Sequence, residues 1–310
     1  MRKSLGPILL GLGTFLLVFA VLAVMWIPGV VKKTPVDVNS TTNLSGEAQR
    51  LDASTGELGT PVPITVQSIT QADSEKSNDD VVVFVNGSCV VENADGQTPP
   101  CVDGEDPRLV SASEDTFATD RVTARSVPNG DFLPAGTVQH EGLVNKWPFD
   151  AEKKTYAFWD GTVGAAVDAV YQGTEDINGL ETYHYRVNVD EAPVEVAKGV
   201  DGTYTNEVNV WVEPKTGSII KQSQDQQRFL DSGAQVLNLQ AEYTDEEVEQ
   251  TVSDAESSKR QLSLLTTWVP LVGFIAGAIC IIAGILLLLR GRRKNNSGPA
   301  HVQKSKAPVA

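Results

Sequence analysis

Residues 262–289, LSLLTTWVPLVGFIAGAICIIAGILLLL, contain no charged side chain. A second uncharged stretch, LGPILLGLGTFLLVFAVLAVMWIPGVV, occupies residues 5–31 near the other end of the chain. Each stretch is longer than the roughly 20 residues that cross the hydrocarbon core of a bilayer as a helix. The sequence therefore predicts a protein that is held in a membrane by one helix at each end.

The first apolar stretch follows Arg2 and Lys3, as the apolar region of a signal peptide does. A cleaved signal has an apolar region of only ~7–15 residues and a cleavage site of small residues. Here the apolar run is longer, and it ends in Trp26-Ile27-Pro28-Gly29 without an Ala-x-Ala pattern. We therefore expect an uncleaved anchor, with a signal peptide as the alternative.

The charged residues are divided unevenly along the 310-residue chain, which has 40 acidic and 25 basic side chains. All 40 acidic and 17 of the basic side chains lie within residues 32–261, which gives that stretch a net charge of −23. Because basic flanks stay in the cytoplasm, we expect both termini to be cytoplasmic and the acidic stretch to lie outside the plasma membrane. The predicted order is a cytoplasmic N-terminus (1–4), a membrane helix (5–31), an extracytoplasmic domain (32–261), a second membrane helix (262–289) and a basic, disordered cytoplasmic tail (290–310).

The acidic stretch has the pattern of a β domain. Within residues 183–189 apolar and polar side chains alternate, which is the period of a half-buried strand. Similar runs recur between turn dipeptides with few helical patterns, so the predicted fold class is a mainly antiparallel β domain, an open barrel, cradle or sandwich, between two transmembrane helices. One helix is expected over 245–261, because Thr244 and Glu247 form a capping-box pattern. Predicted strands lie at 63–70, 81–85, 121–127, 167–172, 183–189, 204–212 and 218–222, with a long strand or a strand pair at 229–243, and predicted loops at 39–60 and 71–80.

Cysteine and histidine are scarce, with three of each. Cys89 and Cys101 fall in the part expected outside the membrane, where an oxidising environment favours a disulfide, and two free buried thiols are the alternative. Closing such a loop would contribute ~3 kcal/mol. Cys280 is expected to be an inert packing residue, and His140 and His184 are expected at the surface.

Motifs of catalysis and cofactor binding are absent from the sequence. We therefore expect no enzyme activity, no catalytic residue, no metal and no cofactor. The excess of acidic side chains argues against binding to nucleic acid, which requires clustered Lys and Arg.

An aromatic cluster is the sharpest local feature of the acidic stretch. It is expected either to fill an ordinary β core or to line an apolar cradle for a ligand. In a cradle, tyrosine hydroxyls could bond to a sugar or an ester group. The candidate ligand-binding residues are Trp147, Phe149, Tyr156, Phe158, Trp159, Tyr183, Tyr185 and Trp211.

Several strings of this stretch also resemble a known family. They are Trp147-Pro148-Phe149, KTYAFWD at residues 154–160, Tyr171-x-Gly173 followed by GLETY at residues 179–183, and VWVEPKTGSI at residues 210–219. Together with the order of anchor, β-rich domain, anchor and basic tail, they make nearly the whole chain resemble the actinobacterial two-anchor envelope proteins of the porin PorA family. Members are linked to polar growth and to trafficking of mycolate glycolipids. The resemblance therefore implies a role in cell-envelope biogenesis.

Three functions are open at this point. The resemblance favours a membrane-anchored accessory protein that binds or hands on envelope glycolipid, with a membrane lipid transporter as a further partner. An envelope scaffold or sensor without a small ligand is the alternative, and a pore-forming protein is the least favoured. A transmembrane barrel needs ~10-residue strands with an apolar outer band. In addition, neither apolar stretch contains an ionisable side chain that could line a pore.

Overall fold

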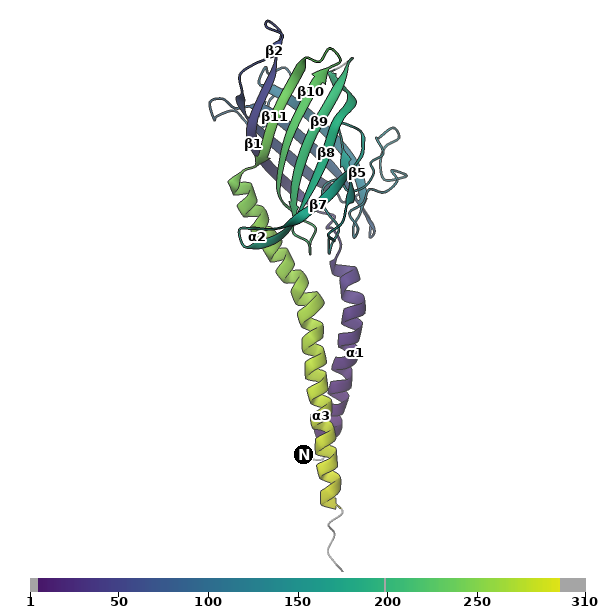
Figure 1. Cartoon of the computed structure of the whole chain (residues 1–310). Helices are drawn as coiled ribbons and strands as arrows, with labels where there is room; N and C mark the ends of the chain where they lie inside the picture. Colours follow the sequence, from purple (N-terminus) through teal and green to yellow (C-terminus); the bar gives the residue numbers. More distant parts are fainter. Residues whose placement is uncertain (1–4, 198, 296–310) are drawn as a thin grey trace, which may run out of the picture. The chain divides into compact units, whose positions relative to one another are not determined.

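The computed structural model describes residues 5–197 and 199–295. The expected cytoplasmic N-terminus (1–4) and the tail beyond residue 295 lie outside the described residues. The chain divides into two compact units, which Figure 1 shows as long helices and as a curled sheet. One unit contains Met1–Val31 and Gln261–Ala310, and the other is Lys32–Arg260. We call them the helix unit and the sheet unit.

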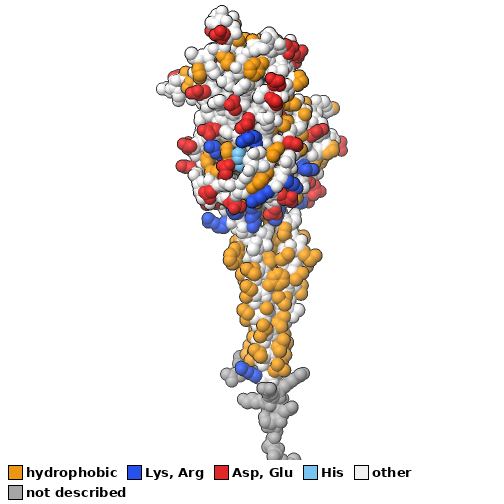
Figure 2. All heavy atoms as spheres, in the orientation of Figure 1, with side chains coloured by type: hydrophobic (Ala, Val, Ile, Leu, Met, Phe, Trp, Pro, Cys, Tyr) orange, Lys and Arg blue, Asp and Glu red, His pale blue; other side chains and the backbone are white. Residues whose placement is uncertain are grey.

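Two long helices form the helix unit. α1 is Leu5–Val31 and α3 is Val269–Asn295, and α3 is preceded by a π-helix at Leu264–Trp268. Both helices are long and apolar enough to cross a membrane. Large apolar side chains are exposed along their surface, with Phe15 64% and Ile279 61% exposed, and Figure 2 shows hydrophobic side chains over much of it and no acidic ones. In a bilayer, the backbone polar groups of such a helix are satisfied mainly within the helix itself.

Small residues hold α1 against α3. A Cβ added at Gly13 would lie 2.7 Å from the carbonyl oxygen of Gly277, and one added at Gly273 would lie 3.0 Å from the Cβ of Ala20. Ala20 is fully buried. Close approach of this kind lets membrane helices gain packing and dispersion energy without a hydrophobic driving force. By contrast, a side chain added at Gly11 would meet nothing within 4 Å.

The sheet unit contains one antiparallel sheet of eleven strands in the order β5-β4-β3-β1-β11-β10-β9-β8-β7-β6, with β2 paired to β1. This agrees with the antiparallel β class predicted from the sequence. The strands are β1 (Asn39–Asp52), β2 (Glu57–Leu58), β3 (Val62–Asp73), β4 (Val81–Glu92), β5 (Leu109–Asp120), β6 (Tyr156–Asp160), β7 (Ala165–Ile177), β8 (Leu180–Ala197), β9 (Val200–Val212), β10 (Ile219–Leu230) and β11 (Gln235–Tyr243).

One face of the sheet is apolar and concave, and Figure 1 shows the sheet curling round it. The register places Val187, Val208, Gln224, Ala241 and Gly46 opposite one another in successive strands, so they share this face. The two largest buried clusters lie on it. The aromatic core contains Leu143, Trp147, Tyr156, Tyr185 and Val210 among others, and the aliphatic core contains Leu44, Ile64, Val66 and Leu239 among others.

The two edges of the sheet are linked by irregular backbone rather than by strands. Segment 125–127 bonds to β5, and Ser126 N donates to Gly142 O at 2.7 Å. Leu143 N then donates to Ala157 O of β6 at 2.8 Å. Gly142 has φ of +74°, and a Cβ there would lie 2.4 Å from Ala157 O, so only glycine fits this position. The irregular segments 125–127 and 142–143 thus bridge the end of β5 to β6, which closes part of the curled sheet.

The polar stretch 39–60 was expected to be a loop, but it forms β1 and β2. The expectation fails because β1 is hydrogen-bonded along both sides, to β3 and to β11. Only Leu44 and Ala48 are buried within β1, and its other inward positions include hydroxyl side chains that face a cavity. A strand whose inner face is partly polar shows no clear alternation in the sequence.

The strand expected over 121–127 is displaced. β5 covers Leu109–Asp120, and the chain then turns, with Asp120 Oδ1 accepting bonds from Val122 N (3.0 Å) and Thr123 N (2.6 Å). This turn competes with a strand by satisfying the local backbone donors. Residues 229–243, expected as one long strand or a strand pair, form the pair, because a turn at Gly233, which has φ of +86°, separates the end of β10 from β11.

Helix α2 (Asp245–Ser263) lies where the capping-box pattern predicts a helix. Glu247 N donates to the Thr244 hydroxyl oxygen at 3.1 Å, as in a capping box. The helix packs Val248, Val252 and Ala255 against Leu180 and Ile220 of the sheet. α2 is therefore fixed to the sheet unit.

Candidate functional site

A cavity of about 680 Å³ lies in the sheet unit and is the largest of those described. Its wall combines residues from strands near both ends of the sheet with residues of segment 34–38, segment 144–146 and α2. It is unusually rich in hydroxyl groups, which come from Thr34, Ser40, Thr41, Thr42, Ser68, Thr70, Ser218 and Thr251. Phe84, Phe117 and Phe158 supply aromatic surface. The size and the mixed lining suit a small polar molecule.

Lys146 supplies the cationic group of the cavity wall. Its Nζ donates to the hydroxyl oxygen of Thr34 at 3.3 Å and lies 4.0 Å from the centre of the Phe149 ring. Burial lowers the pKa of Lys146 from its ordinary 10.5 to about 8, because the ammonium is partly removed from water. The protein groups around the Lys146 ammonium therefore do not fully replace the water that it loses on burial.

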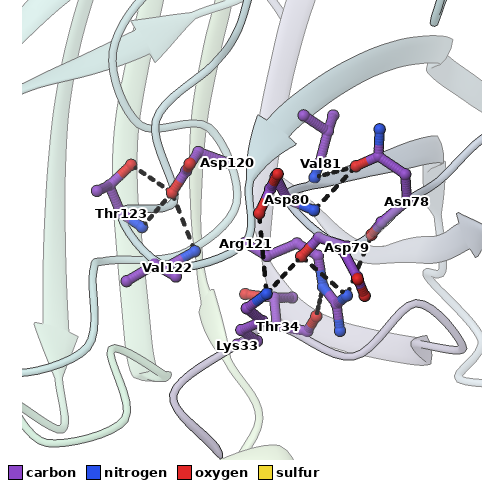
Figure 3. A network of polar contacts seen from close by, with 10 residues as sticks. All are labelled: Lys33, Thr34, Asn78, Asp79, Asp80, Val81, Asp120, Arg121, Val122 and Thr123. Carbon is purple, nitrogen blue, oxygen red and sulfur yellow. Dashed lines mark hydrogen bonds and ion pairs between the residues drawn. The ribbon is translucent and has the colours of Figure 1, made fainter. Parts of the chain in front are cut away.

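A polar network fixes Thr34, the hydrogen-bond partner of Lys146 (Figure 3). Arg121 Nε donates to Thr34 O at 2.7 Å, and Thr34 N donates back to Arg121 O at 2.7 Å. Arg121 Nη1 also donates to the carbonyl oxygen of Asn78, and Lys33 Nζ donates to that of Asp79. The segment that begins the sheet unit is thus bound to the end of β5 and to the turn before β4, which positions Thr34 at the cavity.

Three carboxylates also belong to the lining, and each is bonded elsewhere. Asp115 Oδ2 lies 2.8 Å from His140 Nε2. Glu247 Oε2 accepts from Asn43 N at 3.0 Å, and Asp254 Oδ2 accepts from Gln250 Nε2 at 3.0 Å. The wall therefore contains both charges, but in separate places.

The aromatic residues proposed from the sequence as ligand contacts do not form one surface. Trp147 and Tyr185 are fully buried in the aromatic core, where Tyr156 also lies and Phe158 and Tyr183 pack at its border. The Tyr185 hydroxyl donates to Glu152 O at 2.7 Å, and the Tyr156 hydroxyl accepts from Glu152 N at 2.8 Å. The polar atoms of these two tyrosines are thus already bonded within the protein. Among the eight residues, Phe158 lines the cavity.

Trp211 and Trp159 lie apart from this core. Trp211 is on the opposite face of the sheet, stacked on His184 at 4.6 Å between ring centres, and its Nε1 donates to Glu175 Oε2 at 2.8 Å. Trp159 packs against His140 at 4.5 Å. A cradle lined by all the predicted tryptophans is therefore not what the fold assembles. Ligand binding by any of the eight residues stays a prediction.

Cys89 and Cys101 form the predicted disulfide. The expectation that His140 lies at the surface is wrong, since it is only 3% exposed. It lies between the rings of Phe117 and Trp159, where the two edges of the sheet approach each other. Among the described residues, no group of three or more His, Cys, Asp or Glu is arranged to hold a metal ion.

Sequence reasoning missed Lys146, Thr34 and the hydroxyl groups of β1 and β3. The residues that line the cavity are spread along the sequence from Thr34 to Asp254, so no local sequence motif predicts it. The available signal was the position of Lys146 immediately before the Trp147-Pro148-Phe149 string.

Comparison with known proteins gives a consistent result. The profile of a family described as Porin PorA matches residues 5–286 of the chain. A protein named Porin PorA from Corynebacterium resistens is 25% identical over 235 residues, covering 63% of this chain and 54% of the relative. Another of that name from Corynebacterium amycolatum is 25% identical over 223 residues, covering 61% of this chain and 58% of the relative. The chain thus spans little more than half the length of these curated relatives.

A solved structure described as GphF Dehydratase 1 aligns with a TM-score of 0.12 and 10% identity, covering 74% of this chain and 83% of that chain.

Proposed function

The chain belongs to the PorA porin family, and from that premise we propose that it is a membrane-anchored, pore-forming protein whose conduit is built from the helix units of several copies. The observation that carries the proposal is the family match over residues 5–286, which includes almost all of both apolar helices. The family and both curated relatives are named for a porin.

The interpretation as a glycolipid-handling protein is thereby wrong, and the pore-forming interpretation, least favoured from the sequence, is better supported. The pattern of the strands and the lack of charged side chains in residues 5–31 and 262–289 argue against a pore within one chain. They leave open a conduit assembled from helices of several chains.

One copy cannot enclose a conduit by its helices alone. α1 and α3 approach so closely that Gly13 and Gly277 leave no room for a Cβ between them. A space wide enough for ions therefore has to form between helix pairs, which requires that several copies assemble, most simply in a closed ring.

The sheet is unsuited to cross a bilayer as a barrel. Glu207, Asp225, Gln240 and Glu47 stand opposite one another in a row on its outer face. A transmembrane barrel needs an apolar band on that face, and each charge there is costly in lipid. The aromatic and aliphatic cores also occupy much of the concave face.

The charge distribution supports an orientation and an ion preference. With basic flanks in the cytoplasm, residues 32–261 lie outside the cell membrane and bring a net charge of −23 near the outer mouth. A concentrated negative charge raises the local concentration of cations. Because the apolar stretches 5–31 and 262–289 contain no charged side chain, the conduit through them is apolar, and the charge preference comes from the acidic domain.

Conductance measurement on the full chain tests this function. Protein purified in detergent and added to planar bilayers should give stepwise currents, and a KCl gradient should give a reversal potential that favours K⁺ over Cl⁻. Gly13→Leu should abolish the currents, because its side chain would collide with Gly277 and Ile281. Gly11→Leu adds the same bulk where nothing lies within 4 Å, and should conduct. Inserted protein that passes no current above background would contradict the proposal.

The orientation has its own test. Single cysteines introduced by Gly130→Cys and Ala300→Cys should react with a membrane-impermeant thiol reagent from opposite sides of the cell membrane. Labelling of both from the same side would rule out the arrangement described above.

A further inference from the structure

Two polar side chains on the cavity wall have unused hydrogen-bonding capacity. The Lys146 ammonium has three N–H groups, and it donates one hydrogen bond, of 3.3 Å, to the Thr34 hydroxyl oxygen. Within the described residues, no carboxylate oxygen lies within 4.0 Å of its Nζ. The side-chain oxygen of Asn145, the preceding residue, is buried and has no hydrogen-bond partner there. The wall therefore offers a donor that carries charge and an open amide position.

The carboxylates of the wall do not compensate Lys146. Asp115 is bonded to His140, Glu247 to the backbone of Asn43, and Asp254 to Gln250. Of the other acidic groups near this end of the sheet, Asp150 pairs with Lys32. A partly buried ammonium that lacks an anion is costly, because proteins normally pair buried charges. An anion that enters the cavity would remove this cost.

The surroundings restrict the kind of anion. The acidic charge of the domain opposes multiply charged anions, so a single negative charge is favoured. The cavity of about 680 Å³ is far larger than an inorganic ion needs. Hydroxyl groups of Ser40, Thr42, Ser68 and Thr70 line it, and such groups recognise other hydroxyls as both donor and acceptor.

We propose that the cavity is a binding site for a small hydroxylated monocarboxylate, with the Lys146 ammonium donating to the carboxylate and the Asn145 amide and the wall hydroxyls bonding to the hydroxyl groups of the ligand. The site lies wholly within the sheet unit. It is independent of the pore, so either proposal can fail without the other.

Sodium gluconate is a suitable probe, because it is a hydroxylated monocarboxylate. Binding is measured by calorimetry and by the rise in melting temperature of the full chain in detergent. Sorbitol has the hydroxyls without the charge, sodium acetate the charge without the hydroxyls, and sodium chloride and sodium phosphate test general anion effects at equal ionic strength. We expect gluconate to stabilise the protein most, acetate less, and sorbitol and chloride not at all.

The variants assign the effect to the site. Lys146→Gln should weaken gluconate binding about ten- to a hundredfold, as expected for loss of a charge-assisted hydrogen bond. Lys153→Gln removes a neighbouring lysine outside the cavity lining and should bind as the wild type does. Equal binding by Lys146→Gln and wild type overturns the proposal, as does a gluconate effect no larger than that of sorbitol or chloride. Tighter binding of phosphate than of gluconate overturns the assignment of a monocarboxylate.

Discussion

The helix unit and the sheet unit place their large apolar side chains in opposite ways. In the helix unit the small residues Gly13, Ala20 and Gly277 lie inside and the large apolar side chains lie outside. In the sheet unit the large apolar side chains lie inside, and carboxylates such as Glu207 and Asp225 lie outside. In Figure 2, hydrophobic side chains are spread over the helix unit, whereas acidic side chains are scattered over the surface of the sheet unit.

This opposite placement of large apolar side chains indicates which of the two units can contact lipid. In lipid, close packing between small residues replaces the hydrophobic effect, whereas in water the burial of large apolar groups supplies most of the stability. We therefore assign the conduit to the helix unit and the attraction of cations to the sheet unit. The predictions below test the two halves of this assignment.

The largest effect is expected inside the sheet. Trp147 is fully buried against Tyr185 and Phe158, so Trp147→Ala should lower the free energy of unfolding by ~3–5 kcal/mol. Trp211 on the outer face is the matched control, and Trp211→Ala should cost far less. Urea unfolding followed by circular dichroism measures both. Equal losses in the free energy of unfolding for the two variants would contradict the placement of Trp147 in the core and of Trp211 on the outer face.

Reduction of the disulfide is the next largest effect. Cys89 and Cys101 close a loop that begins in β4, and breaking the bond should lower the free energy of unfolding by ~3 kcal/mol through the greater freedom of the unfolded chain. The comparison is between oxidised protein and protein treated with a reductant, unfolded by urea. Cys280→Ser, in the helix unit, should leave the result unchanged. An unaltered midpoint after verified reduction would contradict this prediction.

Lys146 should give a smaller effect of opposite sign. Its pKa of about 8 in the folded protein lies below its ordinary 10.5, so the unfolded chain holds this proton more tightly. The resulting penalty is fully present below pH 8 and disappears as the pH rises toward 10.5. Lys146→Met should therefore be more stable than wild type by ~2 kcal/mol at pH 7, after allowance for partial exposure.

The measurement for Lys146 is urea unfolding as a function of pH without added carboxylates. The difference between Lys146→Met and wild type should shrink above pH 8. A variant that is less stable than wild type at pH 7 would show that the ammonium is compensated in the folded protein.

The smallest effect is expected when the helix unit alone is changed. Gly13→Leu disturbs the contact of α1 with α3 and should leave the unfolding of the sheet unit as it is in wild type, with Gly11→Leu as the control. Proteolytic resistance of residues 32–260 can be followed by mass spectrometry. A destabilised sheet unit would show that the two units depend on each other for stability.

Much of the fold could be read from the sequence because its signals are local. The charge-free segments predict both long helices. Thr244 and Glu247 predict the start of α2, and the alternation over 183–189 predicts part of β8. β1 was missed because its inner face includes Ser40 and Thr42, which line a cavity rather than a core. Segment 121–127 was misassigned because Asp120 diverts the chain into a turn.

The site was harder to predict because it depends on distant contacts. Whether Lys146 has a counter-charge depends on carboxylates that are far from it in the sequence and bonded elsewhere. The aromatic residues form a cluster in the sequence. In the sheet, however, the alternation of side chains places Trp211 on the outer face and Tyr185 on the inner face.

A cysteine scan with current recording tests the central claim most directly. In a Cys280→Ser background, single cysteines are placed through residues 5–31 and 262–289, and a charged thiol reagent is added while current is measured. We predict block at positions that recur with the period of a helix, and no block after Ser68→Cys or Thr70→Cys on the wall of the sheet cavity. Block from the sheet positions, with none from the helices, would contradict the account.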